Sequence, residues 1–164
     1  ETIIRYIYMG GRGNIIPRHV THFIVHISVK VIPSRAFWGH PNIIEVICHD
    51  KVDKVEEKAF YCCPSLRRVI MPGVEIVEDY TFFECDALKD VECGKLERIR
   101  EGAFTSCKSL SSINLPSVKV VERDTFFDCT ALTDVKFSSK LDTFAGGAPF
   151  RQCISLQRIT IPLK

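Results

Sequence analysis

The sequence of 164 residues lacks several features that would point directly to a functional class. No apolar run approaches the roughly 18 residues of a membrane span, so we expect no membrane insertion in this segment. Basic and acidic residues nearly balance, 22 against 20, which gives no electrostatic reason to expect nucleic acid or an anionic membrane as a partner. The absence of an Asn-x-Ser/Thr sequon argues weakly against a glycosylated extracellular domain.

Motifs for common chemistry are also missing. The glycine stretch GGRGN at residues 10–14 is not followed by the Gly-Lys-Ser/Thr of a phosphate loop, so it predicts a turn between two strands of an N-terminal hairpin. The acidic stretch at residues 50–57 lacks the ligand spacing of a calcium loop. No Cys-x-x-Cys pair strengthens a zinc site.

What the sequence has instead is an internal repeat of 22 to 24 residues. Each copy opens with a phenylalanine, followed by cysteine or histidine at the third position, leucine or isoleucine at the sixth, and valine or isoleucine at the ninth. The phenylalanines are Phe37, Phe60, Phe82, Phe104, Phe126 and Phe150. Because so short a unit cannot bury an apolar face alone, the copies are expected to stack into a solenoid.

Each copy contains a stretch that predicts one short strand. In the copy at residues 66–71, Val69 and Met71 should point inward while Arg68 and Ile70 face outward. With a half-length first unit at residues 20–25, seven parallel strands are predicted.

The segments that connect the strands predict short helical turns. The segment at residues 56–63 begins with acidic residues and places Ala59 and Cys63 four positions apart, the spacing of one helical face. A three-faced parallel β-helix is the competing fold, and it would not need this spacing.

The copies AFYCCPSLRRVIMPGVEIV and AFTSCKSLSSINLPSVKVV resemble the leucine-rich repeats of the BspA-like, surface-antigen type. The resemblance covers about residue 20 to the end of the chain. It implies an α/β fold, a right-handed horseshoe solenoid with short parallel strands on the concave face and short helical turns opposite. It also implies interaction rather than catalysis, with no catalytic residue to transfer, and leaves both cell-surface and intracellular locations open.

On this basis we expect two parts in the chain. Residues 1–19 would form an N-terminal cap or hairpin. Residues 20–164 would form the leucine-rich-repeat solenoid, with about six full units of 22–24 residues after the half-unit.

The eight cysteines predict a reduced ladder inside the solenoid, with disulfides or a metal site as the alternatives. Free cysteine behaves as a small, readily buried hydrophobe. Only Cys62 falls outside the repeat pattern, since two cysteines occupy inward strand slots and five follow the repeat phenylalanines: Cys48 and Cys93, then Cys63, Cys85, Cys107, Cys129 and Cys153. A reduced ladder favours an intracellular location.

All five histidines lie within the first 49 residues. His22 and His26 are predicted to face outward beside Glu45 and His49 of the next strand. The two pairs would lie roughly 13 Å apart along the strand, too far to share a zinc ion, so we predict a solvated polar patch, with a weak two-ligand site as the alternative. His40 takes the slot otherwise held by cysteine and is predicted to be a hydrogen-bonded internal residue.

The outward face of the predicted strands varies from copy to copy, while the inward slots hardly vary. Such freedom makes this concave face the candidate binding surface. Its candidate residues are Glu45, Ile47, Arg68, Ile70, Asp90, Glu92, Ser112, Asn114, Asp134 and Lys136. Ile24, Ile47 and Ile70 would form an exposed apolar strip suited to a protein contact. Alternatively, the charges only alternate in sign to avoid repulsion between strands.

The sequence thus predicts a non-catalytic protein-interaction module that binds a protein partner and needs no cofactor or metal. The alternative is a structural or self-associating spacer, because the chain stops at ITIPLK without a polar cap and leaves its last coil open. A thiol or metal enzyme is the third hypothesis. It is disfavoured because the histidines lie at one end of the solenoid and most cysteines lie several coils away.

Overall fold

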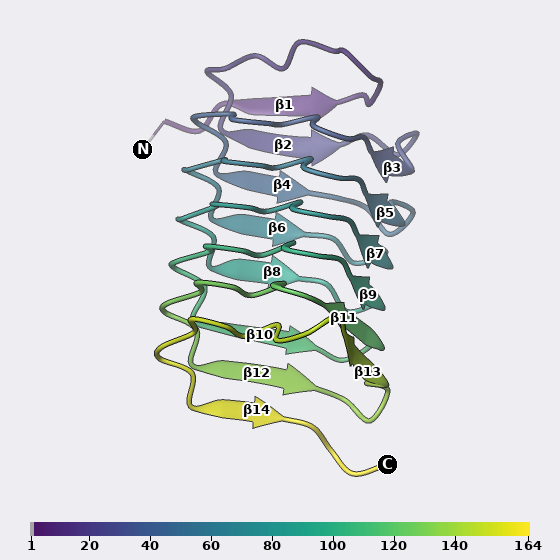
Figure 1. Ribbon diagram of the computed structural model, residues 1–164. Helices are drawn as coiled ribbons and strands as arrows, with labels where there is room; N and C mark the ends of the chain where they lie inside the picture. The colour runs from purple at the N-terminus through teal and green to yellow at the C-terminus, as the bar shows by residue number, and fades with distance from the viewer. Residues whose placement is uncertain (1) are drawn as a thin grey trace.

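The computed structural model describes residues 2–164, which form a stack of coils with two columns of parallel strands (Figure 1). The first column, which we call the main sheet, contains β1 (Arg5–Tyr8), β2 (His22–Val25), β4 (Glu45–Ile47), β6 (Arg68–Ile70), β8 (Asp90–Glu92), β10 (Ser112–Leu115), β12 (Asp134–Phe137) and β14 (Arg158–Thr160). The second column, the second sheet, contains β3 (Val31–Ile32), β5 (Lys54–Val55), β7 (Ile76–Val77), β9 (Arg98–Ile99), β11 (Val120–Glu122) and β13 (Thr143–Ala145).

The seven strands predicted from the repeat are confirmed as β2, β4, β6, β8, β10, β12 and β14. Their inward slots are aligned from coil to coil, so Val69 of β6 pairs with Val46 of β4 and with Val91 of β8. The second sheet was not predicted. Its strands are two or three residues long, and so short a stretch carries no readable alternation of apolar and polar residues.

The turn at residues 10–14 does not lead into a second hairpin arm at residues 15–17, and β1 pairs with a later strand instead. β1 runs parallel to β2, with Arg5 opposite His22 and Tyr8 opposite Val25, whereas the arms of a hairpin must be antiparallel. The segment from residue 9 to residue 21 contains no strand. β1 is therefore the first strand of the main sheet. The boundary between a cap at residues 1–19 and a solenoid at residues 20–164 stays a prediction.

The predicted helical turns are wrong, because residues 2–164 contain no helix. Two positions in each of the first five full copies have positive φ and interrupt any helix, one two residues before the repeat phenylalanine and one two residues after it; the last copy keeps only the second. The first set is Arg35, Lys58, Tyr80, Gly102 and Asp124, and the second is Gly39, Cys62, Glu84, Ser106, Asp128 and Gln152.

Hydrogen bonds between coils replace the helical ones in these segments. Alternate amides donate to the next coil: those of Lys58, Phe60 and Cys62 bond the carbonyl groups of Asp79, Thr81 and Phe83, at 2.7–3.0 Å. The amides between them close short turns within the coil, such as Ala59 to Glu56. The four-residue spacing of Ala59 and Cys63 thus reflects two inward turn positions and not a helical face.

A continuous stack of phenylalanine rings fills the core between the two sheets and the turns. Neighbouring rings from Phe37 to Phe150 have centroids 5.0–5.4 Å apart and planes within 14° of parallel. The interior members of this stack are at most 1 % exposed. Burial of a ring in every coil removes apolar surface that one coil alone would leave in water.

The cysteine ladder runs beside the ring stack and is confirmed. All eight cysteines are free thiols. Each ladder thiol donates to the carbonyl of a phenylalanine in the preceding coil at 2.9–3.2 Å, pairing Cys63, Cys85, Cys107, Cys129 and Cys153 with Phe37, Phe60, Phe82, Phe104 and Phe126. The repeated cysteine therefore combines a small, largely apolar side chain with a hydrogen-bond donor, which an alanine side chain does not have.

His40 takes the place of the thiol in the first full coil, and its predicted role as a hydrogen-bonded internal residue is confirmed. The side chain is buried, and Nδ1 accepts from the amides of Asn42 and Ile43 at 3.3 and 3.0 Å. Nε2 therefore carries the proton and donates to the Pro17 carbonyl at 2.9 Å. Burial lowers the pKa of His40, and the charge of Arg18 lowers it further against the opposing effect of the Pro17 bond.

Replacement of Phe104 by alanine should destabilise the chain strongly, because this ring lies between Phe82 and Phe126 and is fully buried. We expect the free energy of unfolding in urea to fall by about 3–5 kcal/mol. Ile15→Ala is the control, since Ile15 is 92 % exposed and its loss should change stability by less than about 0.5 kcal/mol. A Phe104→Ala effect as small as that of the control would contradict the packed ring stack.

Acid should loosen the coil that contains His40. The folded-state pKa is lowered, so below the ordinary pKa the unfolded chain binds a proton that the folded chain resists, and stability falls as the pH falls. His40→Cys, which restores the residue of the other copies, should therefore lose less stability than the parent chain between pH 7 and pH 5 in urea unfolding. Parallel pH profiles of the two chains would show that His40 does not contribute.

Candidate functional site

The ten predicted binding residues all lie on the outward face of the main sheet, which we call the main-sheet face. Each is exposed or partly exposed. The strand register places Glu45, Arg68 and Asp90 in one column and Ile47, Ile70 and Glu92 in the next. Ser112 and Asn114 then align with Asp134 and Lys136. The placement follows the prediction, whereas the binding role of these residues stays a prediction.

An ion-pair triad crosses the first half of this face. The Arg68 guanidinium donates to Glu45 at 3.2 Å on one side and to Glu92 at 3.1 Å on the other. The hydrogen bonds to Glu92 and Glu45 raise the pKa of Arg68. Ile24, Ile47 and Ile70 form the adjacent row, and Ile24 is 43 % exposed. An apolar strip beside fixed charges is thus present on this face.

A groove opens in the main-sheet face where the sheet is interrupted. Within the main sheet, one hydrogen-bonded group consists of β1, β2, β4, β6 and β8, and another consists of β10, β12 and β14. The step between β8 and β10 is visibly wider than the others (Figure 1). The groove has a volume of about 580 Å³ and is lined by Arg68, Lys89, Asp90, Val91, Glu92, Ser112, Ile113 and Asn114. We call it the β8–β10 groove. It brings together five of the ten predicted residues.

The interruption itself was not predicted from the sequence. The one signal near it is that Cys93 and Gly94 stand where neighbouring copies have Met71 and Pro72 or Leu115 and Pro116. Such a departure does not show how far apart two neighbouring strands lie.

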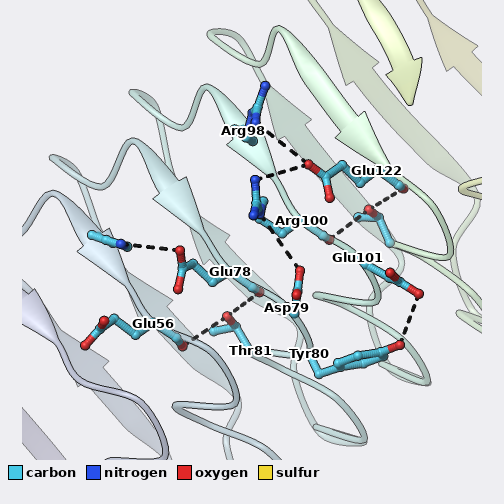
Figure 2. Close-up of polar contacts among 11 residues, drawn as sticks. Glu56, Glu78, Asp79, Tyr80, Thr81, Arg98, Arg100, Glu101 and Glu122 are labelled. Carbon is cyan, nitrogen blue, oxygen red and sulfur yellow. Dashed lines mark hydrogen bonds and ion pairs between the residues drawn. The ribbon is translucent and has the colours of Figure 1, made fainter. Parts of the chain in front are cut away.

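The outward face of the second sheet differs from the main-sheet face, because its charges are paired with one another (Figure 2). Arg98 and Arg100 approach the Glu122 carboxylate at 3.9 and 3.6 Å, and Arg100 also lies 3.9 Å from Asp79. In the same view the Tyr80 hydroxyl donates to Glu101 at 3.2 Å. Exposed pairs of this kind add little stability, but they leave few charges unpaired for a partner.

A second exposed feature, an aromatic stack on the turn side, was missed in the sequence. Trp38, Tyr61 and Phe83 stack with centroids 4.4 and 4.6 Å apart. Arg35 and Lys58 lie over the Trp38 ring at 5.2 and 5.8 Å. The signal was available, since the residue after the repeat phenylalanine is aromatic in three successive copies. The rings cover one another and two cations lie over the end ring, yet Trp38 remains 46 % exposed.

The histidines and cysteines form no evident reactive centre. His22 pairs with Glu45 in the strand register, as predicted, and the His49 ring lies 3.0 Å from the carbonyl oxygen of His26. Residues 2–164 contain no group of three or more side chains suited to hold a metal ion. Burial raises the pKa of the Cys48 and Cys93 thiols to about 12, so neither is a thiolate near neutral pH.

Stacked coils with a common strand register and repeating apolar slots define a leucine-rich-repeat solenoid. The sequence profile described as BspA type leucine rich repeat region (6 copies) matches residues 18–118 and 55–164, and the chain therefore belongs to this family. Proteins of the family are generally not enzymes, and the fold generally serves in protein interaction or as a scaffold. A comparison with curated protein sequences gives no match.

Solved structures agree with this assignment. A leucine-rich repeat protein from Bacteroides ovatus shares 31 % identity and a TM-score of 0.78 over 85 % of this chain, which corresponds to 37 % of that protein. The T. pallidum leucine rich repeat protein shares 23 % identity and a TM-score of 0.68, covering 94 % of this chain and 78 % of that one. The pneumococcal vaccine antigen PcpA shares 18 % identity and a TM-score of 0.64, covering 97 % and 54 %. The last two likenesses show the fold alone.

Within residues 2–164 we find no helix of the length and apolarity that a membrane span requires.

The thiols should react slowly in the folded chain. Cys62 is only partly buried, but burial and the hydrogen bond to Glu84 raise its pKa to about 11. At pH 7 we expect a disulfide reagent such as dithionitrobenzoate to modify the partly buried Cys62 and Cys153 slowly and the buried ladder thiols only after unfolding in urea, with Cys62→Ser removing part of the slow native phase. Rapid native labelling of Cys107 would contradict a closed ladder.

Proposed function

We propose that the chain is a non-catalytic protein-interaction module that binds a macromolecular partner through the main-sheet face. The observation that carries the proposal is the row of Ile24, Ile47 and Ile70 beside the Arg68 triad. An exposed apolar row rimmed by charge is typical of a protein contact, since burial of the row gains hydrophobic free energy while the charges select a complementary partner.

The second sheet supports the choice of face by contrast. Its outward charges already pair with one another, and it presents no comparable row of isoleucines. The main-sheet face also has a groove lined by residues that differ from copy to copy. Both features favour the main-sheet side of the solenoid as the binding side.

Partner capture with matched variants tests the proposal. The chain carrying Ile47→Asp, Arg68→Glu and Ile70→Asp should lose most of a partner that the parent chain retains from a source-cell lysate, because the apolar row and its central charge are both inverted. Urea unfolding should show that the variant remains folded, since all three side chains point outward.

The control places similar changes on the second sheet, as Ile76→Asp, Arg98→Glu and Val120→Asp, and should retain the partner. Equal loss in both variants, or no loss in either, would contradict the main-sheet face as the binding surface.

A structural or self-associating spacer is the second candidate. The exposure of Ile159 favours it, because this residue occupies an inward slot that is buried in most copies and yet is 40 % exposed in the described residues. Growth of the scattering mass with concentration, lost on Ile159→Lys, would favour this candidate. A mass that stays monomeric would oppose it.

A further inference from the structure

The interruption between β8 and β10 leaves backbone groups of the main sheet without their usual partners. At the preceding step, the Asp90 amide donates to the Arg67 carbonyl at 3.0 Å. At the other end of the same step, the Met71 amide donates to the Glu92 carbonyl at 2.8 Å. These bonds show which groups of each strand point toward its neighbour.

The equivalent groups at the next step are the Ser112 and Cys93 amides and the Lys89 and Asn114 carbonyls. Within the part of the chain that the structure describes, no backbone hydrogen bond joins β8 to β10. The Cys93 thiol lies 3.9 Å from the Asn114 carbonyl oxygen, where the amide of Met71 makes its short bond one coil earlier. Each wall of the groove thus presents one donor and one acceptor.

The β8–β10 groove also reaches the apolar interior. Val91 occupies the same inward slot as Val69 and Val135, which are at most 1 % exposed, yet Val91 itself is partly exposed. A ligand in the groove would therefore meet an apolar floor between two polar walls. The volume of about 580 Å³ lies within the range of known ligand sites.

Some charged side chains beside the groove have ion-pair partners and others have none. Asp90 is exposed and makes no ion pair among residues 2–164, whereas Arg68 is already held by the triad. In the same column, Oδ1 of Asp134 is buried without a hydrogen-bond partner. Ser112 pairs with Asp134 in the strand register and takes the repeat slot of Asp90 one coil later, while Lys89 also lines the groove. A cation placed over Ser112 would lie between the two carboxyl groups.

We propose that the β8–β10 groove binds an extended peptide segment of a protein partner, with an arginine or lysine of that segment between Asp90 and Asp134. An extended main chain supplies donors and acceptors along its length with the strand period, as the unpaired groups of the two walls require. Because some Cα atoms of β8 and β10 lie within 8 Å of one another and an inserted strand needs roughly 9.6 Å, the peptide widens the groove as it binds. An aliphatic side chain of the peptide would cover Val91. The proposal rests on the proposed function and specifies its ligand.

Amide NMR titration of the full chain tests this with a defined probe, the capped peptide Thr-Val-Arg-Val-Thr. Shifts should concentrate at residues 89–93 and 111–114. The double variant Asp90→Asn and Asp134→Asn should bind about tenfold more weakly, because two charge-assisted contacts are lost. The control Asp50→Asn and Asp86→Asn, the same charge change at exposed positions away from the groove, should bind as the parent does.

One further variant and one further probe test whether binding depends on the space between the aspartates and on the positive charge of the peptide. Ser112→Arg, at an exposed position, should fold normally and abolish binding, because its own guanidinium occupies the space between the aspartates. The probe with glutamate in place of arginine should not bind. Equal binding of both probes, an unchanged affinity of the Asp90 and Asp134 variant, or shifts elsewhere on the chain would overturn the proposal.

The peptide titration and the partner capture together distinguish failure of the groove as a peptide site from failure of the main-sheet face as a binding surface. If the arginine probe fails while the Ile47, Arg68 and Ile70 variant still loses the captured partner, the groove is not a peptide site and the main-sheet face remains the binding surface. If both tests fail, the proposed function fails with the inference.

Discussion

Every coil of this solenoid buries its apolar slots only against the coils before and after it, and the ring stack shows how strict that requirement is. Each interior repeat phenylalanine lies between two others at nearly the same distance, although the copies vary from 22 to 24 residues, so the extra residues of the longer copies are accommodated outside the ring stack. The ladder thiols reinforce the same register, because each donates to the carbonyl of a phenylalanine one coil earlier. Coil-to-coil packing thus fixes the strand register, and the register in turn decides which side chains share a column on the surface.

The two outward sheet faces, built on the same register, have different electrostatic character. On the second sheet, arginines and glutamates of neighbouring coils pair with each other, as Arg98 and Arg100 do with Glu122. On the main sheet, an isoleucine row lies beside one ion-pair triad, and the exposed Asp90 makes no ion pair among residues 2–164, which leaves both apolar surface and charge available. This asymmetry, rather than the fold, supports a binding role for the main-sheet face, since the same fold serves many functions.

The repeat predicted much of the structure because packing leaves little freedom at buried slots. The seven strands, their inward residues, the cysteine ladder and the internal role of His40 could all be inferred from the recurrence of residue types. The errors fell where the sequence signal is local and ambiguous. The spacing of Ala59 and Cys63 suits a helical face and equally a turn with two inward residues, and only the positive φ of Lys58 and Cys62 excludes the helix. The direction of β1 relative to β2 depends on the path of the chain and not on the residues of either strand.

By itself the sequence determined the period, the identity of the core slots and the set of residues on the main-sheet face, because burial restricts residue type and strand alternation assigns the rest to the surface. Only the tertiary structure decided that the apolar pairs before each phenylalanine form a second sheet, and that the main sheet separates between β8 and β10. Both depend on hydrogen bonds between coils, most of which join residues 21 to 25 positions apart, and which are made by main-chain groups rather than by particular side chains. Side-chain patterns therefore cannot show whether such a bond forms, and in this protein that is what separates a continuous sheet from a groove.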